Sequence, residues 1–394
     1  MSSFTSSSRA IYRKTLAAIL LGMGAAMGSF YLFTIVMDAD QLLGRVTEAR
    51  EALPKIVKED QDLVMMFGSS MVDAGFSPRQ FDREVNAKGK NVKSFNFGFG
   101  GLNPFFQDYL SRRIAEAFKR DNRRLKLAII EFNPFQATQA RWNGAVPAVD
   151  AFLTRLASPQ ELWEITKKDP TRGALLFNIK YLRNEVSAEM VTTFFGRGIF
   201  PPEQAQRIPE PESYLEARKE LDKKLEGAFE KDFPDYDGSD WYYPWQGGGT
   251  IPEDRSEGVP QDIIDYLATF SSPEAMQNYR NRRISSADIE GLNFEPLLLE
   301  SFIGIVKNFQ TIADEVVIVM LPRNHQVISY SPEAESRLNA AIQQIESATN
   351  EKIENHQLIT EVTYDMFRDA THLARYTGDV AYTHFLAEEY LDKL

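Results

Sequence analysis

The chain has 394 residues, a net charge of −12 and no cysteine. The lack of cysteine excludes disulfides, thiolate metal sites and a cysteine nucleophile, and an acidic chain without a Lys/Arg cluster argues against nucleic acid as a partner. The content of 43% apolar and 25% charged residues is typical of a globular protein that can bury a core.

An uncharged run of 23 residues, at positions 15–37, lies near the N-terminus. As an α-helix with a rise of about 1.5 Å per residue, this run is long enough to cross a hydrocarbon core of about 30 Å. Basic residues precede it, so the positive-inside rule predicts a cytoplasmic segment 1–14 and places residues 38–394 in the periplasm or outside the cell. A cleaved signal peptide is the alternative, but the run is long for one. We expect an uncleaved signal anchor in the inner or cytoplasmic membrane.

Residues 38–60 are polar with scattered Leu and Val, which indicates a short helical stalk. Four short apolar runs follow, and they are continuous rather than alternating, as is typical of strands buried on both faces of a parallel sheet. Helical spacing appears in the segments between them. The pattern predicts a three-layer α/β/α domain over residues 61–394. The expected strands are 62–68, 92–99, 125–132 and 314–321, and the expected helices include 103–121 and 331–350.

The alternation breaks between about 141 and 300, where no buried strand is evident. We expect a large, mainly helical or irregular insertion between two core strands, which covers the loop edge of the sheet. It contains the aromatic residues Trp241, Tyr243 and Trp245. Their rings could stack on sugars, or they could pack against the core, and the sequence leaves both open.

Polar groups and glycines stand at the ends of the first three predicted strands, which is where sites form in open α/β sheets. The first strand ends in Gly68-Ser69-Ser70, the second in a glycine-rich turn that includes Gly98, and the third in Glu131-Phe132-Asn133-Pro134. A serine hydroxyl becomes a nucleophile when a base accompanies it. Backbone N–H groups and a side-chain amide are the donors that stabilise an oxyanion.

Among the four histidines, His372 stands out because Asp369 precedes it by three residues. On a helical turn this spacing lets the carboxylate face the imidazole and hold its tautomer, as in a Ser-His-Asp triad. An N-cap aspartate beside a surface histidine is the alternative. His325, after the fourth strand, either lines the site or is an ordinary loop histidine. No histidine pair has the spacing of metal ligands, so we expect neither metal nor cofactor.

These blocks, in this order, resemble the SGNH/GDSL hydrolase superfamily over about residues 62–134 and 314–394. The resemblance implies a nucleophile at Ser70, a base at His372 and its carboxylate partner at Asp369. It also implies an oxyanion hole formed by the backbone N–H groups of Ser70 and Gly98 and by the Asn133 amide.

Two positions depart from the family pattern. Ser69 stands where the family has Asp before the nucleophile, and Glu131-Phe132-Asn133-Pro134 keeps only the Asn of the usual Gly-x-Asn-Asp block. The candidates for substrate binding are Ser69, His325, Trp241, Tyr243 and Trp245.

A membrane anchor joined to such a domain is similar to the D-alanyl-transfer proteins of teichoic acid synthesis and to the SGNH-like proteins of exopolysaccharide O-acetylation. The resemblance implies an extracytoplasmic acyltransferase that takes its acyl group from a multi-pass membrane-bound O-acyltransferase. The acceptor would be a polysaccharide or another surface polymer. Two alternatives stay open, namely an esterase that releases acyl groups from glycan or lipid, and a catalytically degenerate glycan-binding or scaffold subunit of an acylation or export complex.

Overall fold

The computed structural model describes residues 5–36, 41–143, 157–177, 288–374 and 377–394, with five isolated positions between 180 and 284. The chain divides into two compact units. One comprises residues 1–44 and 148–209, and the other comprises residues 45–147 and 210–394. The second unit contains the sheet.

The first unit contains three helices in its described part: α1 (Thr5–Val36), α7 (Pro159–Lys168) and α8 (Pro170–Phe177). Helix α1 includes all but the last residue of the predicted span 15–37. Within the part of the chain that the structure describes, no helix is both long and apolar enough to cross a membrane. The anchor is therefore not confirmed and stays a prediction from the sequence.

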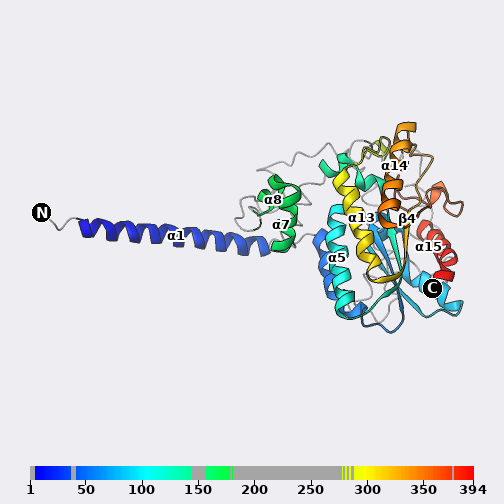
Figure 1. Cartoon of the computed structure of the whole chain (residues 1–394), viewed down its shortest axis with the longest axis horizontal. Coiled ribbons are helices and arrows are strands. Elements are labelled where there is room, and N and C mark those ends of the chain that lie inside the picture. Colours follow the sequence, from blue (N-terminus) through cyan, green and yellow to red (C-terminus); the bar gives the residue numbers. More distant parts are fainter. Residues whose placement is uncertain are drawn as a thin grey trace, which may run out of the picture. The chain divides into compact units, whose positions relative to one another are not determined.

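The second unit is built on a sheet of five parallel strands in the order β2-β1-β3-β4-β5 (Figure 1). The four predicted strands are confirmed within one residue at each end. The fifth was not predicted, because it has only three residues and none of them is fully buried. The strands are β1 (Asp62–Ser69), β2 (Val92–Phe99), β3 (Leu125–Glu131), β4 (Ala313–Met320) and β5 (Ile353–Asn355).

Helices cover both faces of this sheet, which fits the expected three-layer architecture. Helix α13 contacts both α5 and α14, whereas α15 contacts α3 and α4. Figure 1 shows α15 across the strands from α5 and α13. The helices that contact α13 are α5 (Pro104–Arg120) and α14 (Pro332–Thr349), and α13 itself spans Pro296–Gln310. The helices that contact α15 (Gly378–Glu389) are α3 (Ser70–Gly75) and α4 (Pro78–Ala87).

Aromatic side chains join β1 to its neighbour β2 and to helix α13. The Phe67 ring of β1 lies 6.0 Å from that of Phe99 and 5.1 Å from that of Phe309 on α13, measured between centroids. All of β1 after Asp62 is buried. The end of β1 is therefore held in a rigid setting, which fixes the position of the residues that follow it.

Part of the predicted stalk belongs to the folded unit. Helix α2 (Gln41–Ile56) is helical as expected, but Ala52, Leu53 and Ile56 are buried. Buried apolar side chains mean that this segment packs against the domain, since a free stalk would leave them in water.

The predicted insertion begins and ends at one place in the fold. Thr138 and Phe294 form an antiparallel bridge, and Gln139 N–H donates to Asn293 O at 2.7 Å. Because its two ends lie side by side, a long segment between them leaves the sheet undisturbed. Helices α7 and α8 fall within 141–300, and Trp241, Tyr243 and Trp245 lie outside the described residues.

The order of the strands locates the site. From β1 the chain adds β2 on one side and β3 on the other, so the order reverses between β1 and β3. Ligands of open α/β sheets bind at such a reversal, beyond the carboxyl ends of the strands. Here those ends are Ser69 and Glu131.

Close packing of α3 on β2 predicts a large effect for Gly98→Ala. A Cβ at Gly98 would lie 2.2 Å from the backbone nitrogen of Asp73, whereas one at Gly100 would meet Ser70 Cβ at 3.7 Å, an ordinary contact. We expect Gly98→Ala to reduce the free energy of unfolding by about 1–3 kcal/mol, measured by denaturant unfolding. Gly100→Ala is the matched control, and equal denaturation midpoints for the two variants would contradict this packing.

Candidate active site

The two serines after β1 have different places. Ser69 is the N-cap of α3, and its Oγ accepts the backbone N–H of Met71 at 3.2 Å. Ser69 is buried, while Ser70 is partly exposed at the start of the helix. The capping role and the accessible hydroxyl thus belong to different residues.

A tight loop carries the predicted base. Phe367 and Leu373 pair in an antiparallel bridge that closes it. Inside, Asp369 Oδ1 accepts the backbone N–H groups of Thr371 and His372, each at 2.8 Å. The expectation of a helical turn was wrong here. A carboxylate that accepts successive N–H groups forms a side-chain turn of its own, which brings Asp369 and His372 together without a helix.

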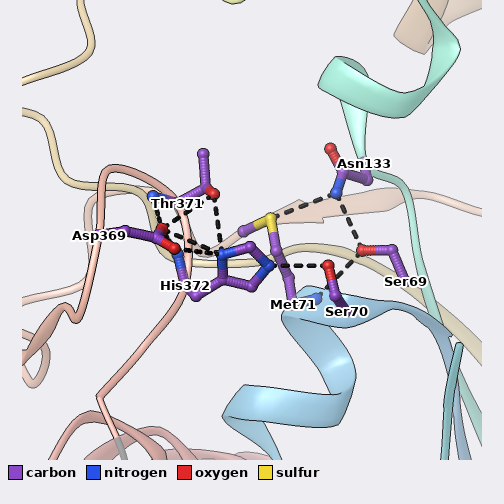
Figure 2. Close-up of polar contacts among 7 residues, drawn as sticks. All are labelled: Ser69, Ser70, Met71, Asn133, Asp369, Thr371 and His372. Atoms are coloured by element: carbon purple, nitrogen blue, oxygen red, sulfur yellow. Dashed lines mark hydrogen bonds and ion pairs between the residues drawn. The ribbon is translucent and has the colours of Figure 1, made fainter. Parts of the chain in front are cut away.

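The structure brings the three residues of the predicted triad within hydrogen-bond distance (Figure 2). Ser70 Oγ lies 2.7 Å from His372 Nε2. His372 Nδ1 lies 2.8 Å from Asp369 Oδ2 and 3.0 Å from Oδ1. These residues come from the end of β1 and from the loop before α15.

The charge state of Asp369 determines which nitrogen of His372 carries a hydrogen. Burial by itself raises the pKa of this carboxyl group, but the charge of His372 and the hydrogen bonds from His372 and Thr371 outweigh burial and hold the pKa well below its usual range. An ionised carboxylate only accepts hydrogen bonds, so His372 Nδ1 carries a proton. When the imidazole is neutral, this tautomer leaves His372 Nε2 to accept the Ser70 hydroxyl, which is the geometry of a general base.

Asn133 follows β3 and faces the same site. Its Oδ1 accepts the Phe135 N–H at 3.0 Å, which fixes the orientation of the amide. Its Nδ2 donates to Ser69 Oγ at 3.0 Å and to Met71 Sδ at 3.2 Å (Figure 2). A thioether is a weak acceptor, so a stronger acceptor that enters the site can replace Met71.

The structure does not bring Gly98 into this group. Its N–H donates to Asn96 Oδ1 at 2.9 Å, and its α-carbon faces the backbone of α3. Gly100 is the glycine beside Ser70, with only 3.7 Å between a Cβ placed there and Ser70 Cβ. The sequence shows a glycine-rich turn after the second strand, but spacing alone could not tell which of its glycines lies beside Ser70.

A small hollow opens beside Ser70, Asn133 and His372. Sequence reasoning missed its other walls, which lie near the two ends of the insertion. Arg141 brings a guanidinium to the hollow, and its Nε donates to Gln136 Oε1 at 2.7 Å. The lining residues near the insertion are Phe135, Gln136, Arg141 and Ile289, and Met71 and Thr371 complete the lining.

Of the candidates for substrate binding, Ser69 and His325 fall among the described residues, and neither lines the hollow. Ser69 is 1% exposed and its hydroxyl contacts Glu131, Asn133 and Met71, so a substrate cannot reach it. His325 is exposed in the loop after β4 and is not part of the lining of the hollow.

One cluster of potential metal ligands occurs among the described residues. Glu84, His384 and Glu388 place ligand atoms within 4.8 Å of one another on α4 and α15. Lys88 forms an ion pair with Glu388, and His384 Nδ1 lies 2.8 Å from Glu84 Oε2. These contacts are those of a surface ion-pair group, and none of the three residues lines the hollow.

A scan against models of protein families finds no match to this chain, and a search of curated proteins finds none.

The ionised state of Asp369 predicts a pH-dependent effect of Asp369→Asn. Because the pKa is lowered in the folded protein, the carboxylate stabilises the fold above its ordinary pKa of about 4, and this contribution is lost as the pH falls further. We expect the variant to be less stable by about 2 kcal/mol at pH 7, with a difference that shrinks below pH 4.

Thermal unfolding followed by circular dichroism from pH 3 to pH 8 measures this difference. Asp365→Asn, at an exposed position of the same region, is the control. A constant difference between the Asp369 variant and the wild type at all pH values would show that the carboxylate is not held ionised by the fold.

Proposed function

We propose that this chain is an SGNH-like serine acyltransferase. The observation that carries the proposal is the continuous hydrogen-bonded set from Ser70 through His372 to Asp369, open to a hollow on the serine side. An oriented serine, base and carboxylate form the arrangement that activates a hydroxyl for acyl transfer. This arrangement also favours an enzyme over the degenerate scaffold considered above.

The first step forms an acyl-enzyme. Ser70 Oγ attacks the carbonyl carbon of an acyl ester, and its proton passes to His372 Nε2. The carbonyl oxygen becomes an oxyanion, for which we assign the Asn133 amide and the backbone N–H groups of Ser70 and Gly100 as donors. When the ester C–O bond breaks, the leaving alcohol takes the proton from His372.

The second step returns the enzyme to its starting state. An acceptor hydroxyl enters the hollow, gives its proton to His372 and attacks the acyl carbon. The bond to Ser70 Oγ breaks, and the serine recovers the proton. With water as acceptor the same steps make an esterase, so the choice between the two activities depends on what the hollow admits.

The sequence pattern suggests the substrates. The resemblance to D-alanyl-transfer and exopolysaccharide O-acetylation proteins favours a short acyl group such as acetyl or alanyl. With the predicted anchor at residues 15–37, the site would face the outside of the cytoplasmic membrane. There it would receive the acyl group from a multi-pass membrane-bound O-acyltransferase and pass it to a polysaccharide or surface polymer. Tethering to the same membrane raises the effective concentration of the two partners.

The proposal predicts covalent labelling at Ser70. We expect a fluorophosphonate probe to label the wild-type protein and Ser329→Ala, which removes an exposed loop serine, and to leave Ser70→Ala unlabelled. Ester hydrolysis should fall at least about 1,000-fold in Ser70→Ala. Fluorescence of the protein band in a gel is the measurement, and equal labelling of Ser70→Ala would identify a different nucleophile.

The proposal also predicts that an acceptor changes the product. With a chromogenic acetyl ester and a hydroxyl-rich oligosaccharide, we expect acetylated sugar in the mass spectrum and faster release of the chromophore, because the acceptor competes with water for the acyl-enzyme. Release that is unaffected by the sugar, with no acetylated product, would identify an esterase instead.

A further inference from the structure

Glu131 lies at the end of β3, beneath the proposed nucleophile, and holds one residue with both of its oxygens. It is 2% exposed. The backbone N–H of Ser69 donates to Oε2, and the Ser69 hydroxyl donates to Oε1 at 3.0 Å. The carboxylate therefore fixes both the backbone and the side chain of the residue before Ser70.

The neighbouring glycine makes room for this contact. A Cβ at Gly68 would lie 2.4 Å from Glu131 Oε2 and 2.6 Å from Glu131 Cβ. The absence of a side chain at Gly68 lets a carboxylate fill the space between the ends of β1 and β3. Gly68 and Glu131 thus form one packing unit.

The contact continues to the proposed oxyanion donor. Since the Ser69 hydroxyl donates its hydrogen bond to Glu131, its oxygen is left to accept the Asn133 amide at 3.0 Å. The amide must therefore present an N–H to Ser69. The second N–H of Asn133 then points to Met71 Sδ at the wall of the hollow.

We propose that Glu131 is a positioning residue of the acyl transfer, whose carboxylate acts through Ser69 to aim the Asn133 amide at the hollow beside Ser70. This inference rests on the proposed function. It also gives a physical account of the two departures from the family pattern, because Ser69 and Glu131, the two unusual residues, contact each other.

The protonation state of Glu131 governs this alignment. Burial raises its pKa to about 7, although hydrogen bonds from Ser69 and Asn133 lower it. Among the described residues, the titratable group that faces it is Tyr382 of α15, which stays neutral because burial and the charges of Glu131 and Glu354 raise its pKa well above the ordinary value. A protonated Glu131 must donate a hydrogen bond, which disrupts the alignment of Ser69 and Asn133.

The test is Glu131→Gln, which keeps the volume but turns an NH₂ donor toward the donors of Ser69. We expect kcat for an acetyl ester at pH 8 to fall about tenfold or more, with KM changed less than about twofold, because the defect lies in the transition state. In the wild type, both His372 and Glu131 must lose a proton, so log(kcat/KM) should rise with a limiting slope of two on the acid side. The slope should be one in the variant.

Two controls separate positioning from folding. A raised pKa means that stability is lost as the pH rises through about 7 and Glu131 ionises. This loss offsets the hydrogen bonds that a glutamine fails to make with Ser69, so the unfolding temperature of Glu131→Gln at pH 8 should stay close to that of the wild type. Asp82→Asn is the matched variant, since burial raises the Asp82 pKa to about 8 and its partner is Ser94 on β2. It should leave the slope of two unchanged.

A second variant, Ser69→Ala, removes the hydroxyl that links Glu131 to Asn133 by hydrogen bonds. It should give the same loss of kcat and a limiting slope of one. Wild-type activity in Glu131→Gln, or lost activity with a slope that stays at two, would overturn the positioning role. Failure of the wild type to react with a fluorophosphonate would instead overturn the proposed function itself, so the two failures are distinguishable.

Discussion

The hydrogen bond between Ser70 Oγ and His372 Nε2 joins residues that are 302 positions apart, and much of the second unit serves to bring them together. Ser70 follows directly on β1, whose residues after Asp62 are all buried. His372 returns to it only after the chain has formed β4, α14 and β5 and closed the loop that ends at Leu373. Gly378 matters here, because a Cβ there would lie 2.2 Å from Met366 O. A larger residue would push α15 away from the loop that holds the base.

The two carboxyl groups near the site, the buried Glu131 and the partly buried Asp369, show how surroundings assign roles to one chemical group. Asp369 accepts two backbone N–H groups and lies beside an imidazole, so it stays ionised and orients His372. Glu131 is buried at the end of β3 and receives its hydrogen bonds from neutral groups, so burial raises its pKa to about 7. One carboxylate acts on the base, and the other acts on the side of the site where negative charge would develop.

The sheet could be predicted from the sequence because its strands are continuous apolar runs between turn residues. β5 could not, since three half-buried residues carry no such signal. Within the site, family order suggested Ser70, His372 and Asp369, and the structure brings them together. Order and spacing along the sequence do not specify local geometry. The structure was therefore needed to find the turn at Asp369, the position of Gly98 and the burial of Ser69. Arg141 and Ile289 were missed because they meet only when the ends of the insertion join.

The separation of Ser70 and His372 along the chain also has a consequence for biosynthesis. At about 5–20 residues per second, the ribosome makes the serine some 15–60 s before it makes the histidine. In the proposed reaction the serine would gain its base only at that point, when nearly all of the domain that encloses the site has been made.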